Sequence, residues 1–133
     1  MYLSDVLQWL KSKFKCQNYY SGRADTNDEE YVAIYELPSS DFAPIAIGSQ
    51  QLLSYDVKVV KFILRYGRNS DIAEKKAKEL FNLFLPAFDG TSVSIGEHRV
   101  ISFRPFTNAP QPLGTDSRGT FEYSFDVLIF YER

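Results

Sequence analysis

The chain has 133 residues, of which 44% are hydrophobic and 24% charged, and its net charge is −2. This length suits one domain with a core of its own, so residues 1–133 are expected to form a single domain. The near-neutral charge disfavours a dedicated nucleic-acid binder, which would carry a basic excess. Cys16 is the one cysteine, so an intramolecular disulfide is excluded.

The sequence also bears on where the protein folds. Its first residues lack the basic and apolar regions of a signal peptide. No apolar run approaches the roughly 18 residues that a membrane span requires. We therefore expect a protein that folds inside the cell and does not enter a membrane.

The first half of the chain shows one helical and several strand patterns. The helical stripe consists of Leu3, Val6, Leu7, Leu10 and Phe14. The elements expected here are a helix over residues 3–15 and strands over residues 17–20, 31–37 and 55–66. Residues 38–54 are expected to form a long connection with a short strand at residues 46–47. The apolar positions of the 55–66 strand switch from odd to even, which indicates either a bulge or two covered faces.

The second half begins with a helix and ends with the clearest strand. Asn69, Ser70 and Asp71 are candidate caps for a helix that ends near Leu85, before Pro86. Further expected elements are a strand over residues 100–106, a loop over residues 107–119 and a strand over residues 121–132. The last strand is predicted from an alternation of apolar and polar residues over about twelve positions.

The order of these elements, α-β-β-β-α-β-β, predicts the fold class. The last two strands are joined by a hairpin-like excursion, so they should be antiparallel neighbours. We expect an α+β fold with a single mixed, mainly antiparallel sheet and two helices packed on one face.

Candidate catalytic residues are few. His98 is the one histidine, and no nucleophile or companion metal ligand accompanies it in sequence. Cys16 follows the lysines of the first predicted helix, but helix ends of this kind oppose a thiolate, so a half-buried bystander is the better interpretation. The glycines match no phosphate-binding or dinucleotide-binding motif. The residues therefore predict no catalytic, cofactor or metal site, and the protein is expected not to be an enzyme.

Each of two polar segments is either functional or an ordinary solvated loop. Asp25, Asp28, Glu29 and Glu30 form an acidic cluster, which is either a solvated loop or a charged face near an interface or pore. The 107–119 loop is long for a compact domain, and it is either a surface loop without a role or an arm that reaches a neighbouring subunit. As an unpaired arm it should tolerate replacement of residues 108–117 by a tight Asn-Gly turn.

One stretch is distinctive. The residues Pro110-Gln111-Pro112-Leu113-Gly114-Thr115-Asp116 lead through Arg118-Gly119 into the tyrosine-containing last strand. An early strand ends at Pro38, and a second strand ends at Arg65 and is followed by a helix. This arrangement resembles the small minor capsid and tail-terminator proteins of long-tailed bacteriophages and prophages, although Thr115 stands where a basic residue is more common.

The resemblance implies a structural virion protein without a cofactor. Its subunits would form a ring, usually of six, that ends the tail tube and joins the tail to the head. Its partners would be its own copies, the tail tube protein and head connector proteins, with viral DNA passing through the lumen. It would be assembled in the bacterial cytoplasm and reside at the head–tail junction.

Within the resemblance, particular residues have expected places. The inter-subunit arm would carry Pro110, Pro112, Leu113, Asp116 and Arg118. Carboxylates in the lumen would repel DNA and let it slide, and the candidates are Asp25, Asp28, Glu29 and Glu30. Two alternatives stay open. One is a cytoplasmic, non-enzymatic α+β domain that binds a ligand or a protein, and the other is an enzyme that uses His98 or Cys16.

Overall fold

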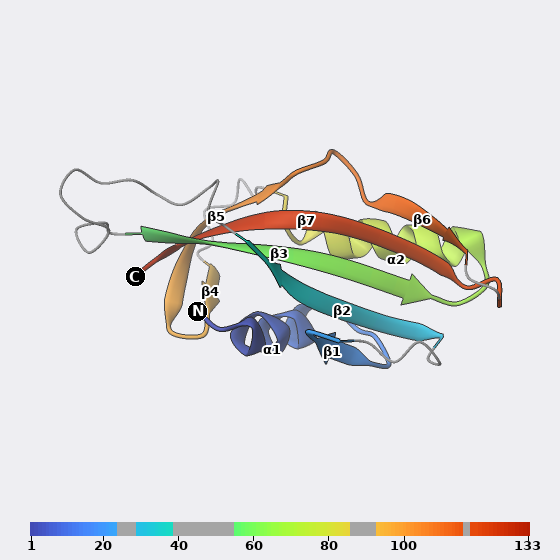
Figure 1. The fold of residues 1–133 in the computed structure, drawn as a ribbon, viewed down its shortest axis with the longest axis horizontal. Helices are drawn as coiled ribbons and strands as arrows, with labels where there is room; N and C mark the ends of the chain where they lie inside the picture. The colour runs from blue at the N-terminus through green and yellow to red at the C-terminus, as the bar shows by residue number, and fades with distance from the viewer. Residues whose placement is uncertain (24–28, 39–54, 86–92, 116–117) are drawn as a thin grey trace.

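The computed structural model describes residues 1–23, 29–38, 55–85, 93–115 and 118–133. Its elements are α1 (Leu3–Lys13), β1 (Tyr19–Ser21), β2 (Glu30–Leu37), β3 (Tyr55–Tyr66), α2 (Ser70–Asn82), β4 (Val93–Ile95), β5 (His98–Pro105), β6 (Gln111–Thr115) and β7 (Phe121–Glu132). The predicted α+β fold is confirmed (Figure 1). The strand expected at residues 46–47 lies outside the described residues, as do Asp25, Asp28 and Asp116.

The strands form one sheet in the order β1-β2-β3-β7-β5-β4, with β6 paired to β7. β1 runs parallel to β2, and the other paired strands are antiparallel. The two longest strands, β3 and β7, are central and pair from Tyr55–Glu132 to Arg65–Glu122. The sheet is therefore mixed and mainly antiparallel, as the sequence predicts, and the last two predicted strands, now β5 and β7, are antiparallel neighbours.

Both helices pack on one face of the sheet, and the main core lies between them and the strands. Alternate positions of β3 and β7 point into this core, because successive side chains of a strand point to opposite faces. The buried side chains shared by this core include Val6, Leu10, Phe14, Ile34, Phe62, Leu80, Phe84, Phe125 and Ile129. Within it, the Phe84 ring lies 4.7 Å from the Phe62 ring centroid and 5.2 Å from the Phe103 ring centroid.

The odd-to-even switch of the 55–66 strand reflects two apolar faces rather than a bulge. Val60, Phe62 and Leu64 belong to the main core. Val57 and Val59 point to the opposite face and pack there with Leu128, and β3 pairs with β7 in continuous register. The first of the two interpretations open at the sequence level, a bulge in this strand, is therefore wrong.

The helix ends follow local capping chemistry. The side chain of Asn69 accepts hydrogen bonds from the backbone N–H groups of Asp71 (3.0 Å) and Ile72 (3.2 Å), which makes Asn69 the N-cap of α2. α1 ends at Lys13, two residues before the expected position, because Phe14 has an extended backbone with φ −133° and ψ 129°. Phe14 then adds a fully buried ring to the core.

The prediction that residues 107–119 lack secondary structure is wrong, because Gln111–Thr115 form β6. Pro112 stands opposite Tyr123, and proline is tolerated there because β6 lies at an edge of the sheet. Excising residues 108–117 would remove a paired strand. It would also leave the remaining chain to follow the 121–126 part of β7, a span of about 17 Å, rather than make a tight turn. The proposed Asn-Gly replacement is thus not neutral for this fold.

Candidate functional site

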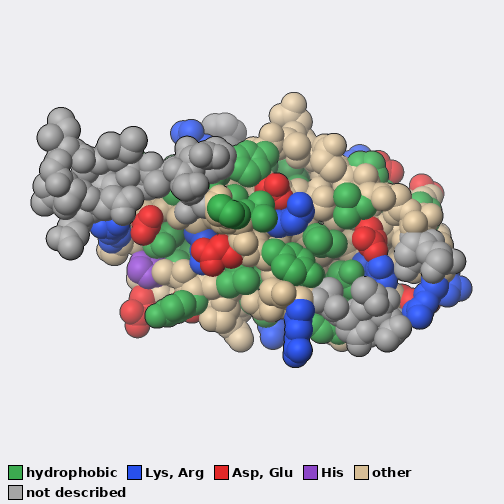
Figure 2. All heavy atoms as spheres, viewed as in Figure 1, with side chains coloured by type: hydrophobic (Ala, Val, Ile, Leu, Met, Phe, Trp, Pro, Cys, Tyr) green, Lys and Arg blue, Asp and Glu red, His purple; other side chains and the backbone are tan. Residues whose placement is uncertain are grey.

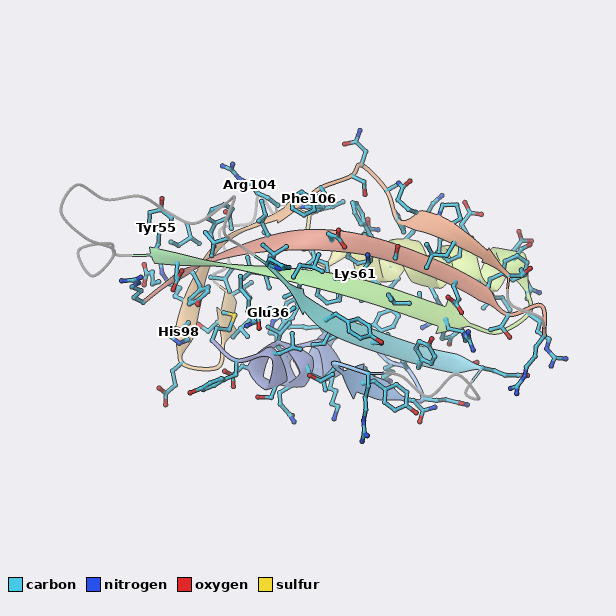
Figure 3. All side chains as sticks on the ribbon, viewed as in Figure 1. Glu36, Tyr55, Lys61, His98, Arg104 and Phe106 are labelled. Atoms are coloured by element: carbon cyan, nitrogen blue, oxygen red, sulfur yellow. The ribbon has the colours of Figure 1, made fainter. Side chains whose placement is uncertain are left out.

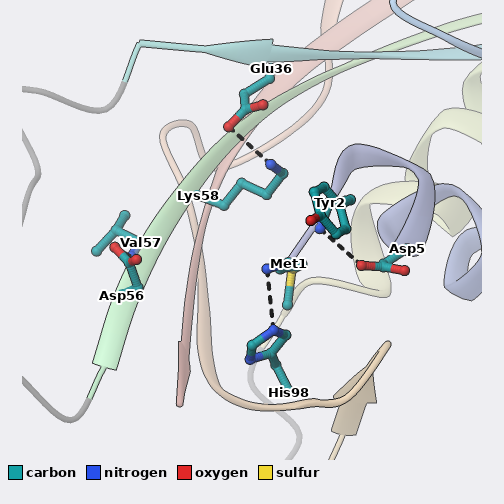
Figure 4. Close-up of polar contacts among 8 residues, drawn as sticks. All are labelled: Met1, Tyr2, Asp5, Glu36, Asp56, Val57, Lys58 and His98. Atoms are coloured by element: carbon teal, nitrogen blue, oxygen red, sulfur yellow. Dashed lines mark hydrogen bonds and ion pairs between the residues drawn. The ribbon is translucent and has the colours of Figure 1, made fainter. Parts of the chain in front are cut away.

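His98 is held by structural contacts on both sides of its ring, and Figure 4 shows the contact with Met1. Its Nδ1 lies 2.9 Å from the carbonyl oxygen of Glu132, and its Nε2 lies 3.2 Å from the amino nitrogen of Met1. Because a carbonyl oxygen can only accept, Nδ1 carries the proton and Nε2 accepts from the N-terminal ammonium. The ring also meets the edge of Tyr131, with centroids 5.1 Å apart. His98 thus fastens the chain start to β5 and β7.

Cys16 lies half-buried after α1. Burial raises the pKa of its thiol, and backbone hydrogen bonds at Asn18 and Gln17 oppose this only in part. A thiol with a raised pKa is a poor nucleophile near neutral pH. Among the described residues, no group of three or more histidine, cysteine, aspartate or glutamate side chains is placed to hold a metal ion.

We expect His98→Ala and Cys16→Ala to leave biological activity unchanged. His98→Ala should still lower the free energy of unfolding by about 1 kcal/mol, because two hydrogen bonds are lost. Complementation of a strain that lacks the gene, with thermal unfolding of the purified variants, measures both. Loss of activity in a normally folded His98→Ala variant would restore the enzyme alternative.

The sheet face turned away from the helices carries a second apolar cluster. Figure 1 shows β3 and β7 in front of α2, and Figure 2 shows hydrophobic side chains among charged ones over the same strands. Buried Val57, Val59 and Leu128 pack there with half-buried Leu37, Tyr55 and Phe130. The Arg104 guanidinium carbon lies 5.3 Å from the centre of the Phe130 ring. This face is apolar at its β5 side, with a cation at its margin.

The margin of this face is formed by β5 and β6, which lie one after the other along β7. β5 stands opposite residues 127–131, and β6 stands opposite residues 121–124. Arg104 and Phe106 lie together at this margin in Figure 3, and Lys61 lies towards the middle of the sheet. β4 pairs with only the first residues of β5, His98 to Val100. The rest of β5 and all of β6 therefore form an edge of the sheet.

The pairing of this edge with β7 is interrupted at three places. The register with β7 shifts between Val100 and Ser102, so Ile101 is an extra residue, and it shifts again between Pro112 and Gly114, so Leu113 is another. The third interruption begins after Phe106, whose N–H donates to the Asp126 carbonyl oxygen at 3.0 Å, while pairing resumes at Gln111.

Each interruption carries or adjoins a large exposed apolar side chain. Ile101 is 51% exposed, Phe106 is 44% exposed and Leu113 is 54% exposed. We call these three side chains the apolar edge. Bulges re-aim side chains, and here they turn Ile101 and Leu113 away from the core. Phe106 faces away from the core by the ordinary alternation of the strand, in which Phe103 packs on the core.

Glu29 and Glu30, the predicted acidic residues that the structure describes, lie at the same end of the sheet as the end of β6. Glu29 accepts from the Gly67 N–H at 2.9 Å through its carbonyl oxygen, and Gly67 in turn accepts from the Phe121 N–H at 3.0 Å. Phe121 stands opposite Thr115 of β6. Glu29, Glu30 and Thr115 at the end of β6 therefore lie at the same end of the sheet.

The predicted residues themselves differ in environment. The Glu29 carboxylate pairs with Arg68 at 3.1 Å, and Glu30 is half-buried. Pro112, Leu113 and Arg118 are exposed, and Pro110 is half-buried. Sequence reasoning missed Ile101, because a bulge removes a side chain from the strand alternation that the prediction used.

The sheet with its exposed apolar edge defines a class of protein suited to contacts with other protein surfaces. Neither described helix is long and apolar enough to cross a membrane. Residues 4–133 match the family model described as "Bacteriophage tail terminator protein", and the chain belongs to this family of structural components of the phage tail. No curated protein matches the chain.

Proposed function

We propose that this protein forms a ring that terminates the phage tail tube and joins the tail to the head. Membership of the tail-terminator family over residues 4–133 carries this proposal. The partners are further copies of the chain, the tail tube protein and head connector proteins. Assembly takes place in the bacterial cytoplasm, and the ring then resides at the head–tail junction of the virion.

The architecture of the sheet supports a ring. A closed ring needs head-to-tail contacts between two different surfaces of each subunit. The sheet has two dissimilar edges, with β1 on one side and the β4, β5 and β6 edge on the other. The apolar edge, with the arm residues Pro110, Pro112, Leu113, Asp116 and Arg118, is the proposed contact on one of these two sides.

DNA passage is the second part of the proposal. A lumen lined by carboxylates repels the phosphate backbone and prevents tight binding of the moving DNA. Asp25, Asp28, Glu29 and Glu30 are the proposed lining residues. The chain also has a net charge of −2, so it offers no overall basic field that would hold DNA.

Imaging of assembled tails tests the proposal. Cryo-electron microscopy of tails from a producing strain should show a ring of this protein at the head-proximal end. Tails made without the gene should lack the ring and fail to join heads. Light scattering of the purified protein is not decisive, because the ring can depend on the tail for assembly. A joined tail whose end lacks the protein would contradict the proposal.

A further inference from the structure

We propose that the apolar edge docks through its side chains on the opposite edge of the next copy, where β1 and the start of β2 lie. The inference rests on the proposed ring and adds the two surfaces that meet and the mode of contact. Its occupant is a second copy of this chain.

The edge formed by β5 and β6 is poorly suited to pairing with a further strand. An open strand edge offers backbone N–H and C=O groups to a further strand. Here Pro105, Pro110 and Pro112 provide no N–H, and the three interruptions break the regular spacing that a paired strand needs. A partner must therefore bind mainly the side chains and not the backbone.

The apolar side chains are concentrated on this edge. Among the described residues, the other large exposed apolar side chains are Tyr2, Ile72 and Leu85, which lie apart on the N-terminus and at the two ends of α2. Single exposed apolar residues are normal on a protein surface, whereas a group on one element indicates a contact site. Ile101, Phe106 and Leu113 form such a group.

Charge complementarity between the two edges favours a second copy of this chain as the partner. Between Val100 and Thr120, the sequence carries Arg104 and Arg118 against Asp116, so this segment has a net charge of +1. Glu29 and Glu30 lie near the opposite edge, at the same end of the sheet as Arg118. Side-by-side copies that are related by a rotation axis along the strands keep like ends level, so Arg118 of one copy faces Glu29 and Glu30 of the next.

The opposite edge also offers an apolar counterpart. Tyr20 of β1 packs edge-on against Tyr31 of β2, with ring centroids 5.7 Å apart. Tyr20 is half-buried, so part of its ring is open to a partner. Aromatic rings beside carboxylates suit a partner that presents leucine, phenylalanine and arginine side chains.

A matched pair of variants tests the apolar edge. Ile101 and Ile72 have almost the same exposure, 51% and 50%, but Ile72 lies on α2. Ile101→Asp should lower tail completion by about tenfold or more, because a charge is placed in a desolvated contact, whereas Ile72→Asp should leave it unchanged. Thermal unfolding of both purified variants controls for folding. Normal tail completion by a folded Ile101→Asp protein would overturn the proposal.

A charge exchange tests the pairing of the edges. Arg118→Glu and Glu30→Arg should each reduce tail completion, and the double variant should recover most of it. Lys75→Glu, which changes the net charge as much as Arg118→Glu and lies exposed on α2, should not reduce it. Equal loss in the double variant would overturn the assigned pairing.

Cross-linking identifies the occupant directly. A photoreactive residue in place of Leu113, activated in assembled tails, should produce a covalent dimer of this chain joined within β1 or at residues 29–31 of the neighbour. Cross-linking to the tail tube protein or a head protein instead would overturn the proposed contact between copies but would not contradict the proposed ring. Absence of the protein from tail ends would overturn the proposed function itself, so the two failures are distinguishable.

Discussion

Phe84→Ala should lower the free energy of unfolding by about 4 kcal/mol, since truncation of a buried phenylalanine loses transfer energy and leaves a cavity. Phe84 is fully buried, and its ring centroid lies within 5.8 Å of those of Trp9, Phe62, Phe103 and Phe125. It therefore joins α1, α2 and three strands. Urea unfolding followed by the fluorescence of Trp9, the one tryptophan, measures the change.

The neighbouring residue provides the control. Leu85 is 44% exposed at the end of the same segment, so Leu85→Ala should cost less than about 1 kcal/mol. The pair separates loss of packing from local backbone effects, because both residues follow the end of α2 and alanine replaces an apolar residue in both variants. Equal losses in the two variants would show that Phe84 does not anchor the core.

The sequence predicted those elements whose side chains alternate between a buried and an open face. The strands expected at residues 31–37, 55–66 and 121–132 correspond closely to β2, β3 and β7. The 121–132 strand shows a period of two, and the 55–66 strand is marked by β-branched and apolar residues on both faces. The main core gives α1 and α2 their helical stripes. Their arrangement in one sheet followed from the order of elements.

The edge strands β4 and β6 could not be predicted in the same way. β4 has three residues, too few for a period, and it turns into β5 at Gly96, whose φ is +60°. Every residue of β6 is exposed, so its sequence carries no core pattern, and its proline argues against a strand. β6 forms because the edge of β7 offers backbone hydrogen-bond partners, and this depends on the tertiary structure and not on the local sequence.

The candidate site was predictable in part. Its prolines and Leu113 stand out in the sequence as a stiff, half-apolar segment. The proximity of Glu29 and Arg118 at one end of the sheet could not be predicted, because it depends on the register of β2, β3, β7 and β6. The exposure of Ile101 depends on a bulge, which changes the facing of one residue without a change in composition.

Glu122→Ala should lower the free energy of unfolding by about 3 kcal/mol, because it leaves a buried cation without its partner. The side chain of Arg65 is 6% exposed, and its Nε donates to the Glu122 carboxylate at 2.9 Å. The Arg65 guanidinium carbon also lies 5.3 Å from the centre of the Tyr31 ring. This cluster links β2, β3 and β7 on the face away from the helices, and urea unfolding measures its contribution.

The exposed pair of Arg99 and Glu132 is the matched control. The hydrogen bond from Arg99 lowers the pKa of Glu132, so the stabilisation is present above the usual glutamate pKa and is lost as the pH falls through the lowered value. Both groups are open to solvent, where ion pairs contribute little. Glu132→Ala should therefore change the unfolding free energy much less than Glu122→Ala at neutral pH.

A double variant separates the attraction within the buried pair from the cost of leaving one charge alone. Arg65→Met with Glu122→Leu replaces both groups by apolar side chains of similar length, which is often neutral or stabilising for a buried pair. We expect it to recover most of the stability that Glu122→Ala loses. Recovery of less than half would mean that the Arg65 cation stabilises the sheet through Tyr31 as well as Glu122, since methionine keeps the packing of the stem but not the charge over the ring.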